Sequence, residues 1–223
     1  MSPAPLNRHI EPVRARPAYP PGVTCAGLLL AAGAGRRLGR PKALVRDSDG
    51  SPWVRRAAEL LAAGGCTPVV VVLGAEAEQA RELLPLDVDV EVVVATEWAD
   101  GMGASLRAGL SALPELAENA DAALVLLVDL PDLVPAVVRR VAQHAAPKAL
   151  ARATYGDTAD AGHGHPVLLG REHWAGAAAT VVGDRGARDY LDAHGVIGVD
   201  CSDLASGADV DTVIDGHADP RVP

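Results

Sequence analysis

From residue 24 to residue 145 the chain alternates between short, almost continuously apolar runs and longer segments in which apolar residues recur at helical spacing. The apolar runs span residues 24–32, 68–74, 90–95 and 122–129, and the helical patterns span residues 51–65, 76–84, 102–113 and 132–145. Unbroken apolar runs are typical of strands that are covered on both faces, whereas recurrence every three to four residues is typical of helices with one buried face. The pattern therefore predicts an α/β fold.

The order of these elements predicts how they are layered. Strand and helix follow each other in turn, which favours a mostly parallel sheet with helices on both faces, that is, a Rossmann-like, three-layer α/β/α architecture. In such sheets, ligands bind beyond the carboxyl ends of the strands. We therefore expect the chemistry of the protein in the loops that directly follow the apolar runs.

Length and composition favour one folded domain. The chain has 223 residues, of which 49% are hydrophobic, and this is enough to build one substantial core. Residues 1–22 contain six prolines and no periodic pattern, so we expect a flexible, proline-rich leader there. The domain is expected over residues 23–215, with a short tail over residues 216–223.

Charge and cysteine content narrow the classes of partner and location. The formal net charge of −9 excludes a general nucleic-acid-binding role, because no overall basic field attracts a phosphate backbone. Cys25, Cys66 and Cys201 are far apart and lack metal-binding spacing, which favours a reducing compartment. No run approaches the about 18 apolar residues that a membrane span requires. We expect a cytoplasmic protein that binds neither nucleic acid nor membranes.

A glycine-rich, basic loop follows the first apolar run, with the sequence GAGRRLGRPK at residues 33–42. Glycines let successive backbone N–H groups curl around an anion, and Arg37 and Lys42 supply the positive charge that a polyphosphate requires. The loop is not a Walker A motif, and its glycine spacing differs from that of a dinucleotide-binding fingerprint. It predicts a phosphate site. The alternative is an ordinary strand-to-helix turn with solvated arginines.

The segment LAAGAGRRLGRPK at residues 30–42 resembles the signature LAAGxGxRMGxxK of the MobA/MocA-like NTP transferases, which include the molybdenum cofactor cytidylyl- and guanylyltransferases. Further segments resemble that family in the same order: residues 97–110, 126–133, 164–174 and 183–191. The resemblance implies the α/β/α fold of the nucleotide-diphospho-sugar transferases. It also implies a nucleotidyltransferase that uses Mg²⁺ or Mn²⁺ to move an NMP group from an NTP and to release pyrophosphate.

The positions that match the family pattern imply a nucleotide site and a catalytic set. The implied nucleotide-binding residues are Leu30, Ala31, Ala32, Gly33, Gly35, Arg37, Lys42, Gly101 and Ser105. Arg37, Lys42 and Asp129 are the implied catalytic residues, which would bind the triphosphate and stabilise the charge on the leaving pyrophosphate. For Ser105, a helix N-cap is the alternative role.

Asp129 is the last residue of the fourth run and directly follows its apolar residues, which places a carboxylate at the carboxyl end of a strand. Oxygen ligands of this kind suit Mg²⁺, and the alternative is a turn-forming aspartate before Pro131. The segment ADVDTVID at residues 208–215 resembles the family segment that supplies a second metal ligand, so Asp209 or Asp211 is implied to complete the site. The remaining alternatives are Asp203, Asp215 and an exposed acidic tail.

The acceptor-side segments imply contacts from His165 and Asp184, although an exposed ion pair of Asp184 with Arg188 is an alternative. The resemblance implies a phosphorylated acceptor, namely molybdopterin or its molybdenum-loaded form, with a molybdoenzyme as a further candidate partner. Ala32 resembles the cytidylyl branch of the family, so CTP is favoured over GTP.

Three questions stay open from the sequence. The acceptor could instead be a sugar phosphate or a phospholactate unit, and a noncatalytic chaperone that binds the cofactor for a molybdoenzyme is an alternative of another class. The protein could be a monomer or a homodimer.

Overall fold

The computed structural model describes residues 19, 21–156, 164–183, 185–210, 213–214 and 217–218, with the backbone alone for the last two pairs. The expected leader and tail lie mostly outside these residues, so the predicted domain boundaries stay predictions. Asp184, Asp211 and Asp215 also lie outside the described residues. None of the helices in the described residues is long and apolar enough to cross a membrane.

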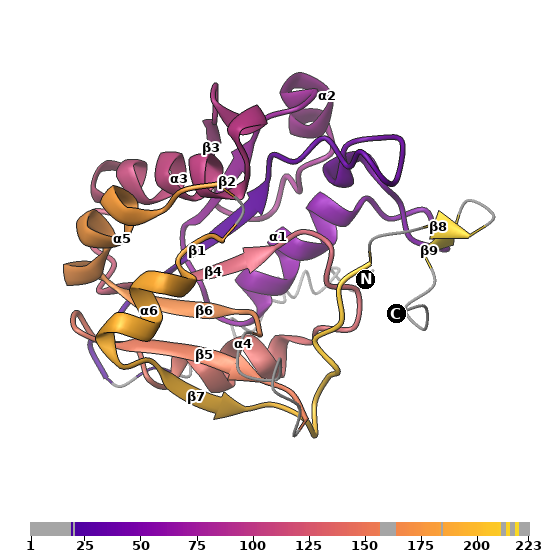
Figure 1. Cartoon of the computed structure of the whole chain (residues 1–223). Helices are drawn as coiled ribbons and strands as arrows, with labels where there is room; N and C mark the ends of the chain where they lie inside the picture. The colour runs from indigo at the N-terminus through magenta and orange to yellow at the C-terminus, as the bar shows by residue number, and fades with distance from the viewer. Residues whose placement is uncertain are drawn as a thin grey trace, which may run out of the picture.

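A seven-stranded sheet forms the middle layer of the molecule, in the order β3-β2-β1-β4-β6-β5-β7 (Figure 1). β6 runs antiparallel to its neighbours β4 and β5, whereas the other neighbouring strands are parallel. The strands are β1 (Cys25–Ala31), β2 (Val69–Leu73), β3 (Val90–Val94), β4 (Ala122–Leu127), β5 (Leu150–Thr154), β6 (Val167–Gly170) and β7 (Ile197–Asp200). The predicted, mostly parallel sheet is confirmed.

Helices cover both faces of this sheet (Figure 1). The helices are α1 (Trp53–Ala63), α2 (Ala77–Glu82), α3 (Met102–Leu116), α4 (Pro135–Ala142), α5 (Trp174–Thr180) and α6 (Arg188–His194). Three short 3-10 helices are η1 (Lys42–Leu44), η2 (Trp98–Asp100) and η4 (Arg171–His173), and β8 (Val213–Ile214) pairs with β9 (His217–Ala218) as a separate ribbon. The α/β/α layering is therefore confirmed.

Two apolar cores lie on opposite faces of the sheet, and β1 contributes to both. Leu29 and Ala31 pack with residues of α1, α2 and α4, whereas Leu28 and Leu30 pack with residues of α3, α5 and α6. Successive side chains of a strand point to opposite faces, so a strand with helices on both sides has no solvent-facing position. This geometry explains why the sequence of β1 is apolar throughout.

The path of the chain creates a crevice between β1 and β4. From β1 the chain proceeds to β2 and β3 on one side, and it then returns to place β4 on the other side of β1. Leu30 of β1 pairs with Leu127 of β4, so the two strands end at the same level. The loops that follow them diverge, and this divergence is where ligands bind in open α/β sheets.

The four strands and four helices that the sequence pattern predicts are all present, each with slightly shorter or shifted ends. The pattern did not predict β5, β6 and β7. These strands have only four or five residues each, and β7 exposes three of its four positions, so they carry no long apolar signal. Trp53 and Trp174 are buried, in agreement with the packing role expected of large apolar side chains.

We expect Leu124→Ala to lower the free energy of unfolding by about 2–5 kcal/mol, because it leaves a cavity in a core strand. Leu124 lies in β4 and is fully buried, whereas Leu86 is fully exposed between α2 and β3, so Leu86→Ala is the matched control with the same chemistry. Urea unfolding of both variants measures the difference. Equal losses of stability would contradict the described packing.

Candidate active site

A cavity of about 420 Å³ opens at the carboxyl ends of β1 and β4. Its walls come from three segments that are distant in the sequence: the glycine-rich loop after β1, the stretch from η2 into α3, and the end of β4. The lining includes Leu30, Ala31, Ala32, Gly33, Gly35, Lys42, Gly101, Ser105 and Asp129. The fold thus brings together nearly all the residues that the sequence predicts for nucleotide binding.

The glycine-rich loop depends on Gly35 for its path. Gly35 has a φ of +57°, and a Cβ atom there would lie 2.0 Å from the carbonyl oxygen of Arg40. Its own carbonyl accepts a hydrogen bond from the Leu38 backbone N–H at 2.9 Å. No other residue type can adopt this φ and this close approach without strain. The tight turn brings the chain back to the cavity, where Lys42 begins η1.

Lys42 and Asp129 form an ion pair at this cavity, between Nζ of the lysine and Oδ2 of the aspartate. The Asp129 side chain is 8% exposed, and its other oxygen, Oδ1, is buried and accepts no hydrogen bond from the described residues. A buried carboxylate oxygen without a donor costs about 1–3 kcal/mol. Oδ1 of Asp129 is therefore suited to bind a ligand cation, which would replace the missing donor.

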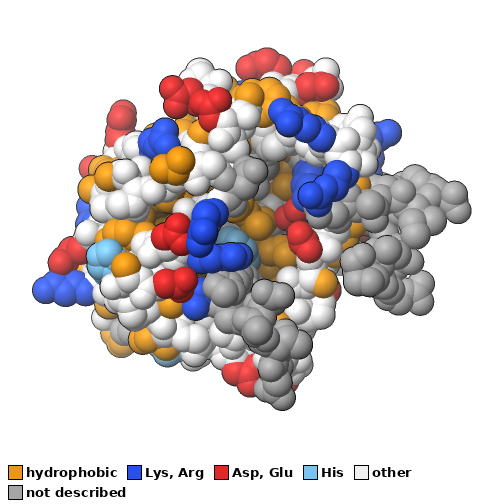
Figure 2. Space-filling view, in the orientation of Figure 1, with side chains coloured by type: hydrophobic (Ala, Val, Ile, Leu, Met, Phe, Trp, Pro, Cys, Tyr) orange, Lys and Arg blue, Asp and Glu red, His pale blue; other side chains and the backbone are white. Residues whose placement is uncertain are grey.

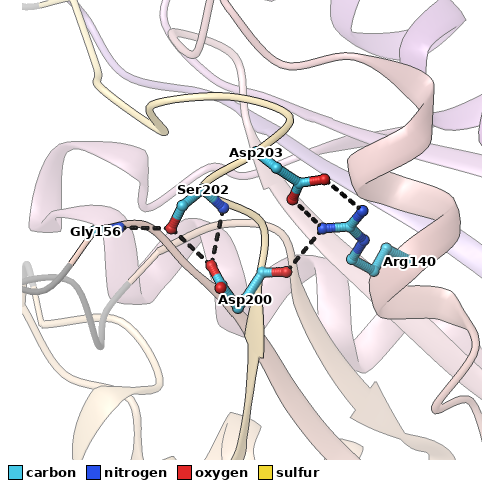
Figure 3. Close-up of polar contacts among 5 residues, drawn as sticks. All are labelled: Arg140, Gly156, Asp200, Ser202 and Asp203. Atoms are coloured by element: carbon cyan, nitrogen blue, oxygen red, sulfur yellow. Dashed lines mark hydrogen bonds and ion pairs between the residues drawn. The ribbon is translucent and has the colours of Figure 1, made fainter.

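The C-terminal part of the chain reaches the backbone of Asp129 from another direction. The backbone N–H of Val210 donates to the backbone carbonyl of Asp129 at 3.1 Å, so residue 209 lies beside the end of β4. Asp209 is exposed, and Asp211 lies outside the described residues. Asp203 is engaged elsewhere, because Arg140 binds it in a two-pronged ion pair (Figure 3). The contacts of the described residues therefore favour Asp209 over Asp203 as a second ligand, and Asp211 stays a prediction.

Within the described residues, no three His, Cys, Asp or Glu side chains lie close enough to hold a metal ion by themselves. This finding fits a cation that is shared with a nucleotide, because Mg²⁺ at phosphate sites is held by one or two carboxylates together with phosphate oxygens and water. It does not fit a closed structural zinc site, which needs four protein ligands. The donor set around Asp129 therefore suits a hard divalent cation.

The start of α3 forms the opposite wall of the cavity. Gly101 precedes the helix with a φ of +111°, and no side chain caps the helix. Ser105 lies one turn into the helix and is 5% exposed, so the alternative interpretation of Ser105 as the N-cap is wrong. Its place in the cavity wall is consistent with the predicted nucleotide contact.

A second, smaller cavity of about 110 Å³ adjoins the first, and Leu30 and Met102 line both. His165 lies in this second cavity, with Nδ1 at 3.3 Å from the Val125 carbonyl oxygen. Burial lowers the pKa of the His165 imidazole, although the Val125 carbonyl and the negative charge of Asp129 oppose the shift. His165 is therefore neutral near pH 7 and donates its Nδ1 proton to the carbonyl.

Arginines surround the second cavity, and the excess positive charge suits an anionic ligand. Arg152 pairs with Asp192 at 3.4 Å and Arg185 pairs with Asp189 at 2.7 Å, whereas the Arg188 side chain has no partner among the described residues. Figure 2 shows basic and acidic side chains gathered beside a histidine at the margin of a central hollow. Guanidinium groups bind phosphate and carboxylate oxygens through paired hydrogen bonds.

Some lining residues were not singled out from the sequence. Arg36 lines the nucleotide cavity, whereas the neighbouring Arg37 is exposed and lies outside the lining, so the role of Arg37 stays a prediction. Asp100 and Met102 also line the cavity. Asp100 and Met102 lie on either side of the predicted Gly101, and this position is the one signal in the sequence that could have indicated them as lining residues.

Comparison with known proteins places the chain among nucleotidyltransferases. Residues 27–197 match the model of the MobA-like NTP transferase domain. The chain is 40% identical over 193 residues to "Nicotine blue oxidoreductase" of Paenarthrobacter nicotinovorans. The aligned residues cover 84% of this chain and 92% of that protein.

Among solved structures, Rv0371c from Mycobacterium tuberculosis H37Rv is 28% identical with a TM-score of 0.66, over 86% of this chain and 94% of that one. A second structure of that protein, a complex with manganese, is 26% identical with a TM-score of 0.62, over 80% and 88% of the two chains. A nucleotidyl transferase from Methanothermobacter thermautotroptrophicus is 22% identical with a TM-score of 0.71, over 85% and 92%, and it supports the fold alone. With a family model that spans most of its length and a 40% identical relative covered almost completely, this chain belongs to the MobA-like NTP transferases.

Proposed function

We propose that the protein is a metal-dependent nucleotidyltransferase that moves an NMP group from an NTP, CTP by preference, to a phosphorylated acceptor, and that this acceptor is molybdopterin or its molybdenum-loaded form. The observation that carries the proposal is the state of Asp129. One of its oxygens pairs with Lys42, and the other is buried without a donor among the described residues, at the edge of a cavity that can seat a nucleotide.

Asp129, with Asp209 or Asp211, would hold Mg²⁺ or Mn²⁺ in this proposal. The bound cation would neutralise charge on the triphosphate, which is the chemistry that such metals supply in nucleotidyl transfer. Lys42 would donate hydrogen bonds to phosphate oxygens and stabilise the charge that develops on the leaving pyrophosphate. The glycine-rich loop would orient the triphosphate, with Arg37 as a further cation at its rim.

The preference for CTP rests on Ala32 and on the wall formed by Gly101 and Ser105. Ala32 is buried at the end of β1 and lines the cavity, in the place where it resembles the cytidylyl branch of the family. The small residues at the start of α3 allow a base to approach the helix backbone closely. A hydroxyl at Ser105 offers both a donor and an acceptor to a pyrimidine edge.

The acceptor would enter through the second cavity. This cavity adjoins the nucleotide site along Leu30 and Met102, so a molecule there lies beside the nucleotide. The arginines around it favour an acceptor that carries a phosphate, and neutral His165 offers Nε2 as a hydrogen-bond acceptor for a polar group of the ligand. Asp184 stays a predicted contact. Sugar phosphates and phospholactate share the phosphate and are the alternative acceptors.

A second candidate function comes from the name of the 40% identical relative, nicotine blue oxidoreductase. An oxidoreductase reaction on nicotine blue is therefore the second candidate for this chain. That reaction needs a hydride donor such as a reduced nicotinamide dinucleotide, whose diphosphate a glycine-rich loop at a strand end is able to bind. Oxidation of this donor by nicotine blue, in the presence of the protein, would favour the second candidate over the first.

Pyrophosphate release from each of the four NTPs, with and without molybdopterin, tests the proposed reaction. We expect release with CTP and molybdopterin, and we expect Asp129→Asn to lower the rate on the order of 100-fold or more, because it removes the anionic metal ligand. Asp87→Asn, at an exposed loop position, is the matched control and should keep the wild-type rate. NTP binding without release for any acceptor would favour the chaperone alternative.

Replacing Lys42 tests the phosphate contact separately from the chemistry. We expect Lys42→Met to weaken CTP binding about 10- to 100-fold, since a charge-assisted hydrogen bond contributes about 1.5–3 kcal/mol. Lys148 is the one other lysine of the chain and is 81% exposed, so Lys148→Met is a natural control. Calorimetric titration with CTP measures both variants. An unchanged affinity in Lys42→Met would exclude the lysine from the nucleotide site.

Removal of divalent cations should abolish the reaction. We expect EDTA to stop pyrophosphate release and added Mg²⁺ or Mn²⁺ to restore it, because the carboxylate of Asp129 cannot neutralise a triphosphate by itself. A rate that persists in excess chelator would contradict a metal-dependent mechanism. Titration of each cation against the chelated protein provides the measurement.

A further inference from the structure

Residues 200–210, here called the C-terminal segment, run from the end of β7 to the backbone of Asp129. Arg140 of α4 holds the start of this segment, as Figure 3 shows. Its guanidinium donates two hydrogen bonds to the carboxylate of Asp203, one of them at 3.0 Å, and a third to the Asp200 carbonyl oxygen at 3.0 Å. The Arg140 guanidinium lowers the pKa of the Asp203 carboxyl, so the pair stays charged near neutral pH.

The turn at the start of the segment is also fixed to the neighbouring strand. The Ser202 hydroxyl donates to Oδ1 of Asp200 at 2.6 Å and accepts a hydrogen bond from the Gly156 backbone N–H at 2.8 Å (Figure 3). Cys201 donates its backbone N–H to the Thr154 carbonyl oxygen at 2.9 Å. The segment therefore leaves β7 in one direction, set by bonds to the end of β5.

Asp132 holds the middle of the C-terminal segment. Oδ2 of Asp132 accepts hydrogen bonds from the backbone N–H of Ser206 at 2.5 Å and from its hydroxyl at 2.6 Å. Asp132 lies three residues after Asp129, on the loop that follows β4, so it ties the segment to the loop that carries the metal-binding carboxylate.

A close contact with Tyr155 and a last backbone bond complete the path. A Cβ atom on Gly207 would lie 2.2 Å from the Tyr155 ring, so the segment passes flat against that ring, and the Tyr155 hydroxyl donates to the His165 carbonyl oxygen at 2.6 Å. The segment ends with Val210, which is buried and donates its N–H to the Asp129 carbonyl oxygen at 3.1 Å.

We propose that Arg140 and Asp132 are positioning residues for the divalent cation: they hold the C-terminal segment so that Asp209, next to Val210, reaches the cation bound by Asp129. The proposal rests on the proposed metal-dependent function. Neither residue lines the nucleotide cavity, and both act through the segment. Groups that orient metal ligands from outside the coordination shell typically change metal affinity by about 10- to 100-fold when they are removed.

The exposure of the contacts made by Arg140 and Asp132 determines how much Mn²⁺ affinity we expect each substitution to remove. The Arg140 side chain is 34% exposed and that of Asp203 is 64% exposed, and exposed ion pairs contribute little because water and salt screen them. Asp132 accepts two short hydrogen bonds close to the metal site. We therefore expect a loss of Mn²⁺ affinity of about 3- to 10-fold in Arg140→Met and of about 10-fold or more in Asp132→Ala.

Binding of Mn²⁺ alone to the nucleotide-free protein, followed by the electron paramagnetic resonance signal of the free ion, is the direct test. Arg139→Met is the matched control, because Arg139 is the preceding residue of α4 and donates to the Ala63 carbonyl oxygen instead. Asp132→Asn keeps an oxygen acceptor for Ser206 and should recover most of the Mn²⁺ affinity that Asp132→Ala loses. Binding of CTP without metal should be the same in all variants, and thermal unfolding verifies that each is folded.

A double-mutant cycle shows whether Arg140 acts through the segment. Arg140→Met and Asp203→Asn should each weaken Mn²⁺ binding, and the double variant should lose no more than the stronger single variant, since both remove one contact. Unchanged Mn²⁺ affinity in Arg140→Met and Asp132→Ala, with binding that Asp129→Asn abolishes, would overturn the positioning role and leave the proposed function standing. No Mn²⁺ binding in the wild type would overturn both.

Discussion

The pairing of Lys42 with Asp129 is the interaction on which the rest of the site depends. The two residues are 87 positions apart in the sequence, and they meet because β1 and β4 are neighbours that end at the same level. A carboxylate that is almost fully buried needs a cation close by, since burial strongly disfavours an isolated charge. The turn at Gly35 returns the chain to the cavity before Lys42 is reached. The path of the glycine-rich loop therefore determines whether Lys42 can neutralise the charge of Asp129.

Asp129 also interacts with residues other than Lys42. Its backbone carbonyl receives Val210, and its negative charge acts on His165 across the boundary of the two cavities. Asp129, which lines the first cavity, therefore also acts on a residue of the second cavity. A change in charge at Asp129, by a bound cation or by substitution, is felt on both sides, because electrostatic interactions are strong where water is excluded.

The sequence predicted the layers of the fold for a physical reason. Strands covered on both faces have unbroken apolar sequences, and the loops after them carry the residues of the candidate site, such as Lys42 after β1 and Asp129 after β4. The reversed strand β6 carries no such local signal in the sequence. The contacts of Arg140 with Asp203 and of Asp132 with Ser206 carry none either, because they join residues 63 and 74 positions apart in the sequence. Whether Arg36 or Arg37 turns toward the cavity depends on the path of the backbone through the loop. Gly35 in this loop adopts neither right-handed helical nor extended geometry, so no periodicity in the sequence predicts this path.

The sheet divides the labour of the protein at β4. β1, the end of β4 and the loops between them line the first cavity, whereas most residues of the second cavity come from β5, from β6 and the turn before it, and from α6 and the turn before it. Substitutions in the second group of elements change no residue that lines the first cavity, so the lining of the second cavity can vary while that of the first is kept. This modularity offers a simple account of how a chain of this family can be 40% identical to a protein that is named for an oxidoreductase reaction.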